Sequence, residues 1–113
     1  MRVPHESRAY WTRLDAQQAA ALTARVLREW GLWCVFEISQ RYTLSRAGVA
    51  QTGGGKPPRI VIYPLGLQVG TVLHECAHVI THALYAPAPI RSHGREFQEV
   101  FYLLLERWHE GLI

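Results

Sequence analysis

The stretch that decides the fold runs from Val69 to Tyr85 and reads VGTVLHECAHVITHALY. Apolar residues recur in it at steps of three and four, which is the period of an amphipathic helix. Pro87 and Pro89 follow directly and prevent the helix from continuing. We therefore predict a helix over residues 69–85, with one broad apolar face turned to the core. That face comprises Val72, Leu73, Cys76, Ala77, Ile80, Ala83 and Leu84.

The same helix carries the pattern His-Glu-x-x-His at residues 74–78. His74 and His78 are four residues apart, so their imidazoles project from one face and can bind one metal ion. Glu75 lies about 100° round the helix, beside that site and outside the set of ligands. A carboxylate there can take a proton from water bound to zinc, which lowers the pKa of that water to about 7. We therefore expect one catalytic Zn²⁺ per chain, with Glu75 as the general base and Cys76 turned away into the core.

A catalytic zinc site needs a third protein ligand, and the sequence leaves several candidates open. His93 is the first, because it lies where the chain returns from the proline turn and Gly94 beside it allows a close backbone approach. His82 shares the face of His78, but it lies a further turn along the helix, about 6 Å away. We therefore assign His82 to the cleft or the surface and keep it only as an alternative ligand.

Two glutamates compete with His93 for the third position. Residues 92–108 predict a further helix, and Glu96 and Glu99 lie one and two turns into it. A glutamate supplied by a helix that follows His-Glu-x-x-His completes the zinc site in some peptidases. From the residues alone, His93 is therefore favoured as the third ligand, and Glu96 and Glu99 remain alternatives.

One helix precedes the strands in the sequence. Residues 1–11 are interpreted as an irregular arm, and a helix is predicted from Thr12 or Asp15 to Trp30. Asp15 can cap its first turn, and Gly31 follows its last apolar position, as is typical of a helix end.

Three short strands are predicted between this helix and residue 69. They cover residues 33–42, 43–50 and 59–64, and the glycine- and proline-rich loop 52–58 joins the second and third as a hairpin. The third is short and ends in proline, which predicts an edge strand. An edge strand can pair with an extended peptide substrate. The residues expected to bind the substrate in this way are Ile60, Val61, Ile62 and Tyr63.

Composition excludes several classes of protein. The chain has 113 residues, of which 49% are hydrophobic and 19% charged, so we expect one folded domain over residues 1–113. No apolar run approaches the roughly 20 residues of a membrane span, and from the polar first residues no secretory signal is expected. Cys34 and Cys76 cannot build a disulfide framework, so a cytoplasmic protein is expected. The net charge of +3 permits contact with nucleic acid, but no run of Lys and Arg indicates it.

Two segments resemble the SprT-like and related short zincin metallopeptidases. Thr71–His78 carries His-Glu-x-x-His, and Ser92–Phe97 reads SHGREF, a later histidine followed by a spacer and an aromatic residue. Residues 45–50 and 59–62 also resemble the hairpin that precedes the active helix in that family. The resemblance implies an α+β, minimal zincin-like fold: an N-terminal helix, a small antiparallel three-stranded sheet, the active helix and a C-terminal helix. It also implies that His74, His78 and His93 bind zinc in a peptidase that hydrolyses peptide bonds.

The chain also departs from that family. No cysteines remain for a C-terminal zinc ribbon, and no separate DNA-binding element is visible, so a protein crosslinked to DNA is not carried over as the substrate. Two alternatives stay open, a zinc-dependent hydrolase of a non-peptide substrate and a non-catalytic zinc-binding interaction module. Glu75 favours the peptidase, because closed structural zinc sites prefer cysteine and need no acid beside the ligands. The candidates for stabilising an oxyanion are Tyr63, His82, Tyr85 and Arg91.

Overall fold

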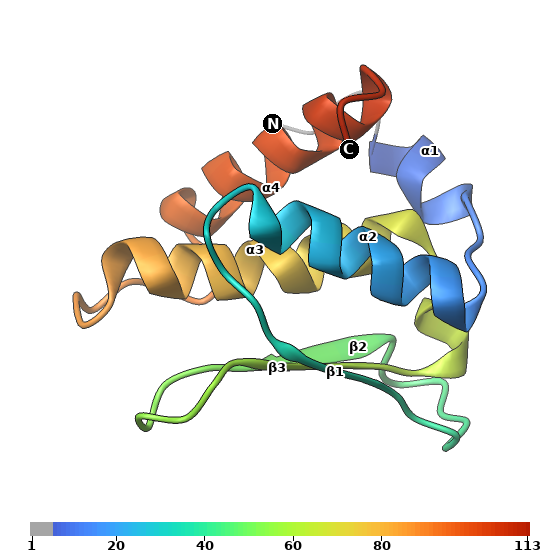
Figure 1. The fold of residues 1–113 in the computed structure, drawn as a ribbon, viewed down its shortest axis with the longest axis horizontal. Coiled ribbons are helices and arrows are strands. Elements are labelled where there is room, and N and C mark those ends of the chain that lie inside the picture. Colours follow the sequence, from blue (N-terminus) through green and yellow to red (C-terminus); the bar gives the residue numbers. More distant parts are fainter. Residues whose placement is uncertain (1–5) are drawn as a thin grey trace.

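The computed structural model describes residues 6–113, which form an α+β fold with helices before and after a small sheet (Figure 1). The helix predicted over residues 69–85 is confirmed at both ends, and the hairpin between the second and third strands is confirmed as well. No helix in residues 6–113 is long and apolar enough to cross a membrane. The elements are α1 (Glu6–Trp11), α2 (Ala16–Arg28), β1 (Val35–Ile38), β2 (Gly48–Gln51), β3 (Arg59–Ile62), a 3₁₀ turn (Pro64–Gly66), α3 (Val69–Tyr85) and α4 (Arg95–His109).

Helix α3 lies at the centre of three layers. The sheet forms one layer, α2 and α3 cover one of its faces, and α4 and α1 pack on the opposite side of α3 (Figure 1). From Val72 to Ile80 the apolar face of α3 is fully buried between them, as its three- and four-residue spacing predicts. The prediction is wrong for Ala83 and Leu84, which are exposed near the end of the helix. A helix held on several sides is a rigid base for side chains that must keep a fixed geometry.

The sheet differs from the antiparallel sheet that the sequence predicts. Its strand order is β1-β3-β2, with β1 parallel and β2 antiparallel to β3. The edge-strand prediction for residues 59–64 is therefore wrong, because β3 is the central strand and both its edges are paired. Ile60 and Ile62 are fully buried, and Pro64 comes after the last paired residue, so it interrupts no hydrogen bond of the sheet.

This topology removes the predicted substrate site on β3. Ile60, Val61 and Ile62 pair on both sides within the sheet, and the amide of Tyr63 donates to the carbonyl of Ala47 at 2.9 Å. No backbone edge is left there for a peptide. The open edge that faces α3 belongs to β2, whose one partner within residues 6–113 is β3.

The N-terminal part contains two helices where one was predicted. Residues 6–11 form α1, so the irregular-arm prediction is wrong for them, and residues 1–5 lie outside the described part of the chain. Packing explains the difference, because Ala9 in this short helix is fully buried against the core. The cap predicted for α2 is confirmed: Asp15 accepts from the amide of Gln18 at 2.7 Å, and Gln18 accepts from the amide of Asp15.

Gly66 marks a close approach of two backbone segments. A Cβ atom at this position would lie 1.9 Å from the carbonyl oxygen of Ala47, which also accepts the Tyr63 amide. Gly66→Ala must therefore separate these segments, and we expect it to lower the free energy of unfolding by about 3 kcal/mol. Gly54→Ala has only backbone strain, since no atom lies within 4 Å and φ is +68°, and should cost about 1 kcal/mol. Urea denaturation measures both, and an unchanged Gly66→Ala midpoint would contradict the close approach.

Candidate metal centre

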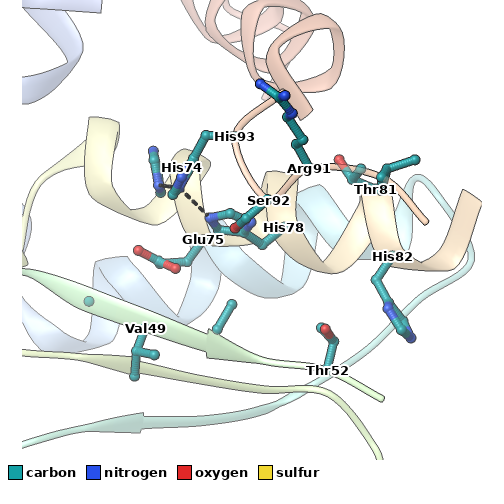
Figure 2. Close-up of a pocket in the computed structure, with 13 residues that line it drawn as sticks. Val49, Thr52, His74, Glu75, His78, Thr81, His82, Arg91, Ser92 and His93 are labelled. Carbon is teal, nitrogen blue, oxygen red and sulfur yellow. Dashed lines mark hydrogen bonds between the residues drawn. The ribbon is translucent and has the colours of Figure 1, made fainter. Parts of the chain in front are cut away.

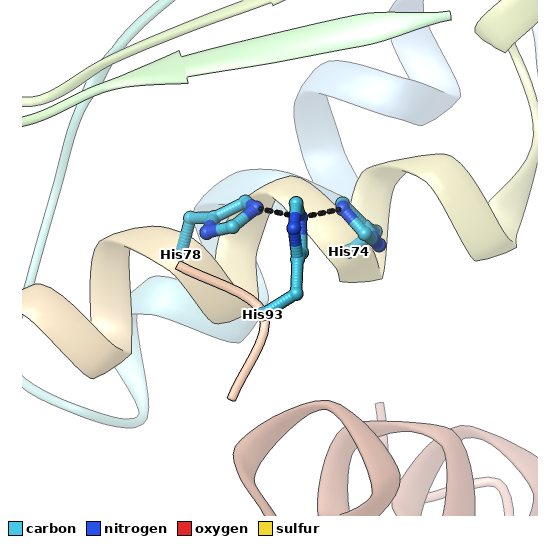
Figure 3. Close-up of side chains that lie close together, drawn as sticks. All are labelled: His74, His78 and His93. Carbon is cyan, nitrogen blue, oxygen red and sulfur yellow. Dashed lines mark hydrogen bonds between the residues drawn. The ribbon is translucent and has the colours of Figure 1, made fainter. Parts of the chain in front are cut away.

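Three histidines from two segments converge on one point (Figure 3). The Nε2 atom of His93 lies 3.0 Å from that of His78 and 3.3 Å from that of His74. Two nitrogen ligands bound to zinc in tetrahedral geometry at 2.0–2.1 Å are about 3.3–3.4 Å apart. These ligand atoms all lie within 4.8 Å of one another, so the three histidines could hold a metal ion.

The backbone that follows α3 brings His93 back to the face of this helix that carries His74 and His78. Gly94 is the N-cap of α4, and its amide donates to the carbonyl of Arg91 at 3.2 Å. The side-chain amide of Gln98 donates to the carbonyl of His93 at 3.3 Å. The turn before α4 is therefore held from both sides, which fixes the position from which the His93 side chain reaches the other two histidines.

Phe97 supports all three imidazoles. Its ring is 2% exposed and stacks on His78, with ring centroids 4.4 Å apart. It makes edge contacts with His74 at 4.9 Å and with His93 at 5.1 Å. Phe101 lies behind it and stacks on Phe97. This packing restricts rotation of the ligand rings, so the metal site is largely formed in advance.

Burial keeps the two helix histidines neutral. Desolvation is the largest of the effects that lower the pKa of His74 to about 4, and the neighbouring His78 and His93 also contribute. Desolvation also lowers the pKa of His78 to about 4, with a second contribution from His93. A neutral imidazole is the form that binds a metal ion, so these two side chains do not have to lose a proton at pH 7.

Glu75 lies next to the triad, in the space between α3 and β2 (Figure 2). Gly48 of β2 allows this approach, since a Cβ atom there would lie 3.2 Å from the Glu75 Cγ atom. The residue is 6% exposed, and burial raises the pKa of its carboxyl group to about 7. No ion pair joins it to any other residue between 6 and 113. Its carboxyl group is therefore suited to accept and release a proton near neutral pH.

A cavity of about 520 Å³ opens over the triad and Glu75. Residues of α3 form its floor, and the segment that carries His93 and strand β2 form its two sides (Figure 2). The sequence prediction missed β2 as part of the site. The sequence signal for it is Gly48, the first residue of β2. Because glycine has no side chain, α3 can pack close to the strand there. The strand residues that line the cavity are Gly48, Val49 and Ala50.

The other ligand candidates lie outside the cluster. Glu99 is exposed, and its carboxylate accepts from the Nε atom of Arg95 at 3.0 Å. Glu96 is half-buried on α4 and does not belong to the group of possible ligands among the described residues. His82 lines the main cavity further along α3 and is exposed. The structure thus brings together the three histidines that the resemblance implies.

Only two of the four residues predicted as candidates for stabilising an oxyanion lie at the main cavity. His82 and Arg91 line the main cavity, although the Arg91 guanidinium is directed away from β2 (Figure 2). Tyr63 lines a separate cavity, and Tyr85 is half-buried at the end of α3 and lines neither.

Tyr10 of α1 is a further residue near the site that the sequence analysis did not identify. It lines two smaller cavities with His74, one of which also includes Glu75. Gly70 makes room for it, because a Cβ atom there would lie 2.6 Å from the Tyr10 ring. Burial raises the pKa of Tyr10 to about 12, with Glu6 and Glu75 adding to the effect, so its hydroxyl stays a donor. It was missed because residues 6–11 were interpreted as irregular.

No protein-family model, no curated protein and no solved structure matches this chain. The function therefore has to be argued from the residues and their geometry. Those residues provide three imidazoles that could hold a metal ion, a buried carboxyl group beside them and an open cavity above.

Proposed function

We propose that this chain is a zinc metallopeptidase with a minimal zincin-like fold. The observation that carries the proposal is the combination of three convergent imidazoles with a buried acid beside them, in an open cavity. A structural zinc site would be closed by four protein ligands, usually with cysteine among them. Both cysteines of the chain are free, and Cys76 is buried on the opposite side of α3 from the triad.

His74, His78 and His93 would hold the zinc ion, and their number leaves a coordination position for water or substrate. Bound zinc supplies a Lewis acid that polarises a carbonyl group and makes water nucleophilic near neutral pH. Phe97 contributes by holding the three rings in place.

Glu75 is assigned the proton transfers. Its carboxylate takes a proton from the attacking water and delivers it to the amine that leaves when the peptide bond breaks. Two properties support this role, its place beside the triad and its burial, which in the metal-free protein raises the pKa of the carboxyl group to about 7. Its shielded position also strengthens its electrostatic effect on the reacting groups.

The substrate is expected to lie along β2. Among the residues that the structure describes, this strand is paired on one side only, so its other backbone edge can form hydrogen bonds with an extended peptide. Gly48 keeps this edge close to Glu75, and the scissile bond would then cross the cavity in front of the triad. We therefore propose that the peptide binds to β2, and not to β3 as the sequence predicts.

Zinc-dependent cleavage of an unfolded protein tests the proposal. Protein loaded with one equivalent of zinc is expected to cut reduced, carboxymethylated casein, and mass spectrometry of the products should identify new N-termini. A chelator should stop the reaction, and one equivalent of zinc should restore it. Zinc-loaded protein that cuts no polypeptide but hydrolyses small esters or amides would support the non-peptide alternative. Protein that binds zinc and hydrolyses neither would support a non-catalytic zinc-binding module.

A further inference from the structure

A second polar cavity, of about 250 Å³, lies at the end of β3 beyond the metal centre. Two guanidinium groups and three hydroxyl groups line it, and no carboxylate of the described residues does. We call it the arginine–hydroxyl pocket. Its residues are Arg41, Thr43, Ser45, Arg46 and Tyr63.

The segment that forms this pocket is attached to the sheet at both ends. The amide of Ser39 donates to the carbonyl of Ile62 at 2.9 Å, and the amide of Tyr63 donates to the carbonyl of Ala47 at 2.9 Å. Residues 39–47 therefore leave and return at the same end of β3. Because both ends of the segment 39–47 are fixed at this point, its side chains surround the arginine–hydroxyl pocket.

Local hydrogen bonds order the middle of the connection. The hydroxyl groups of Thr43 and Ser45 lie 3.0 Å apart, and the amide of Ser45 donates to the Thr43 hydroxyl. The amide of Arg41 donates to the Ser39 hydroxyl at 3.1 Å. These bonds preform the turn and leave one hydroxyl hydrogen of the Thr43–Ser45 pair to donate to a ligand. A preformed turn lowers the entropic cost of binding a ligand there.

The charge of the pocket is not compensated. Three other arginines, Arg59, Arg95 and Arg107, form ion pairs with glutamates. Arg41 and Arg46 form none with the residues that the structure describes. Guanidinium groups bind the oxygens of phosphate and carboxylate through two parallel hydrogen bonds, and nearby hydroxyl groups can donate to the remaining oxygens. A pocket of this composition is suited to an anion with several oxygen atoms.

The pocket borders a cavity that reaches the candidate metal site. Ser45 and Arg46 also line a cavity of about 370 Å³ that includes His74 and Glu75. A ligand bound by Arg46 on one side could therefore extend to the triad on the other. This position next to the histidines distinguishes the pocket from an ordinary group of surface arginines.

We propose that the arginine–hydroxyl pocket binds an oxyanion, a phosphate or carboxylate group, carried by the substrate beside the bond that is cut. Binding of the anion does not depend on catalysis, whereas its role as a substrate subsite rests on the proposed function. The peptidase would then prefer polypeptides with an acidic or phosphorylated residue on the side of the scissile bond that faces Arg46.

Titration of isotope-labelled protein with inorganic phosphate tests the site. At constant ionic strength, we expect saturable amide shifts in residues 39–47 and at Tyr63, with and without one equivalent of zinc. Arg41→Gln and Arg46→Gln should each weaken binding about tenfold. Arg25→Gln, which removes an exposed arginine of α2, should leave it unchanged. Shifts that do not saturate, that centre on the histidines, or that persist in both pocket variants would overturn the proposal.

A second comparison identifies the source of the anion. Methyl phosphate that binds more tightly than acetate would indicate a phosphorylated substrate, and equal binding would indicate an acidic side chain. Binding of neither above the level of chloride would overturn the proposal. Because these measurements need no turnover, failure of anion binding and failure of zinc-dependent cleavage are separate results.

Discussion

His93→Ala is expected to reduce zinc affinity by more than a hundredfold and to leave the fold intact. Disturbing a group that only orients a ligand already costs about 10–100-fold in metal affinity, and loss of a ligand atom should exceed that. His93 is exposed and lies in the turn before α4, so its removal creates no cavity in the core. Competition with a chromophoric zinc chelator measures the affinity, and circular dichroism monitors the fold.

His82→Ala is the matched control. His82 lies on the same helix as two triad members and lines the same cavity, but it is not part of the cluster. Its removal should leave zinc binding at the parent level. Full zinc affinity in His93→Ala, together with loss of zinc in Glu96→Ala or Glu99→Ala, would show that the third ligand comes from α4.

The helix that carries the site is predicted correctly from the sequence, whereas the elements that pack around this helix are predicted less well. Residues 69–85 combine a strong apolar period with two following prolines, so both the helix and its ends are predictable. The spacing of His74 and His78 fixes their common face for the same reason. Each of these features depends on residues that are close together in the chain.

The features that sequence reasoning missed depend on contacts between distant residues. The apolar residues 59–62 predict a strand, but period-two patterning does not say which strands lie beside it, so its central place was missed. Helix α1 has too few residues to be stable alone and forms because Ala9 is buried. The packing of α1 and of the sheet against α3 brings Tyr10 and Gly48 to the site. In the sequence, the signs of this close packing are the glycines Gly48 and Gly70.

Glu75→Gln is expected to reduce peptide hydrolysis by at least 10²–10⁴-fold while zinc binding stays at one equivalent. A positioned general base contributes a factor of this size, and glutamine has the same shape but cannot accept the proton from water. The substitution is sterically conservative at a site that is 6% exposed. Burying a neutral amide costs less than burying a carboxylate, so the metal-free variant should be at least as stable as the parent at neutral pH.

Three measurements separate the general-base role of Glu75 from a structural one. Glu96→Gln makes the same chemical change at a half-buried glutamate of α4 outside the main cavity, and it should retain parental turnover. Elemental mass spectrometry should find the same zinc content in both variants and in the parent. Because β2 and the triad are untouched, Glu75→Gln should still bind a peptide that the parent cuts, with a similar dissociation constant. Turnover by Glu75→Gln at the parental rate would exclude the carboxyl group as the general base, and peptide hydrolysis would then have to use another group.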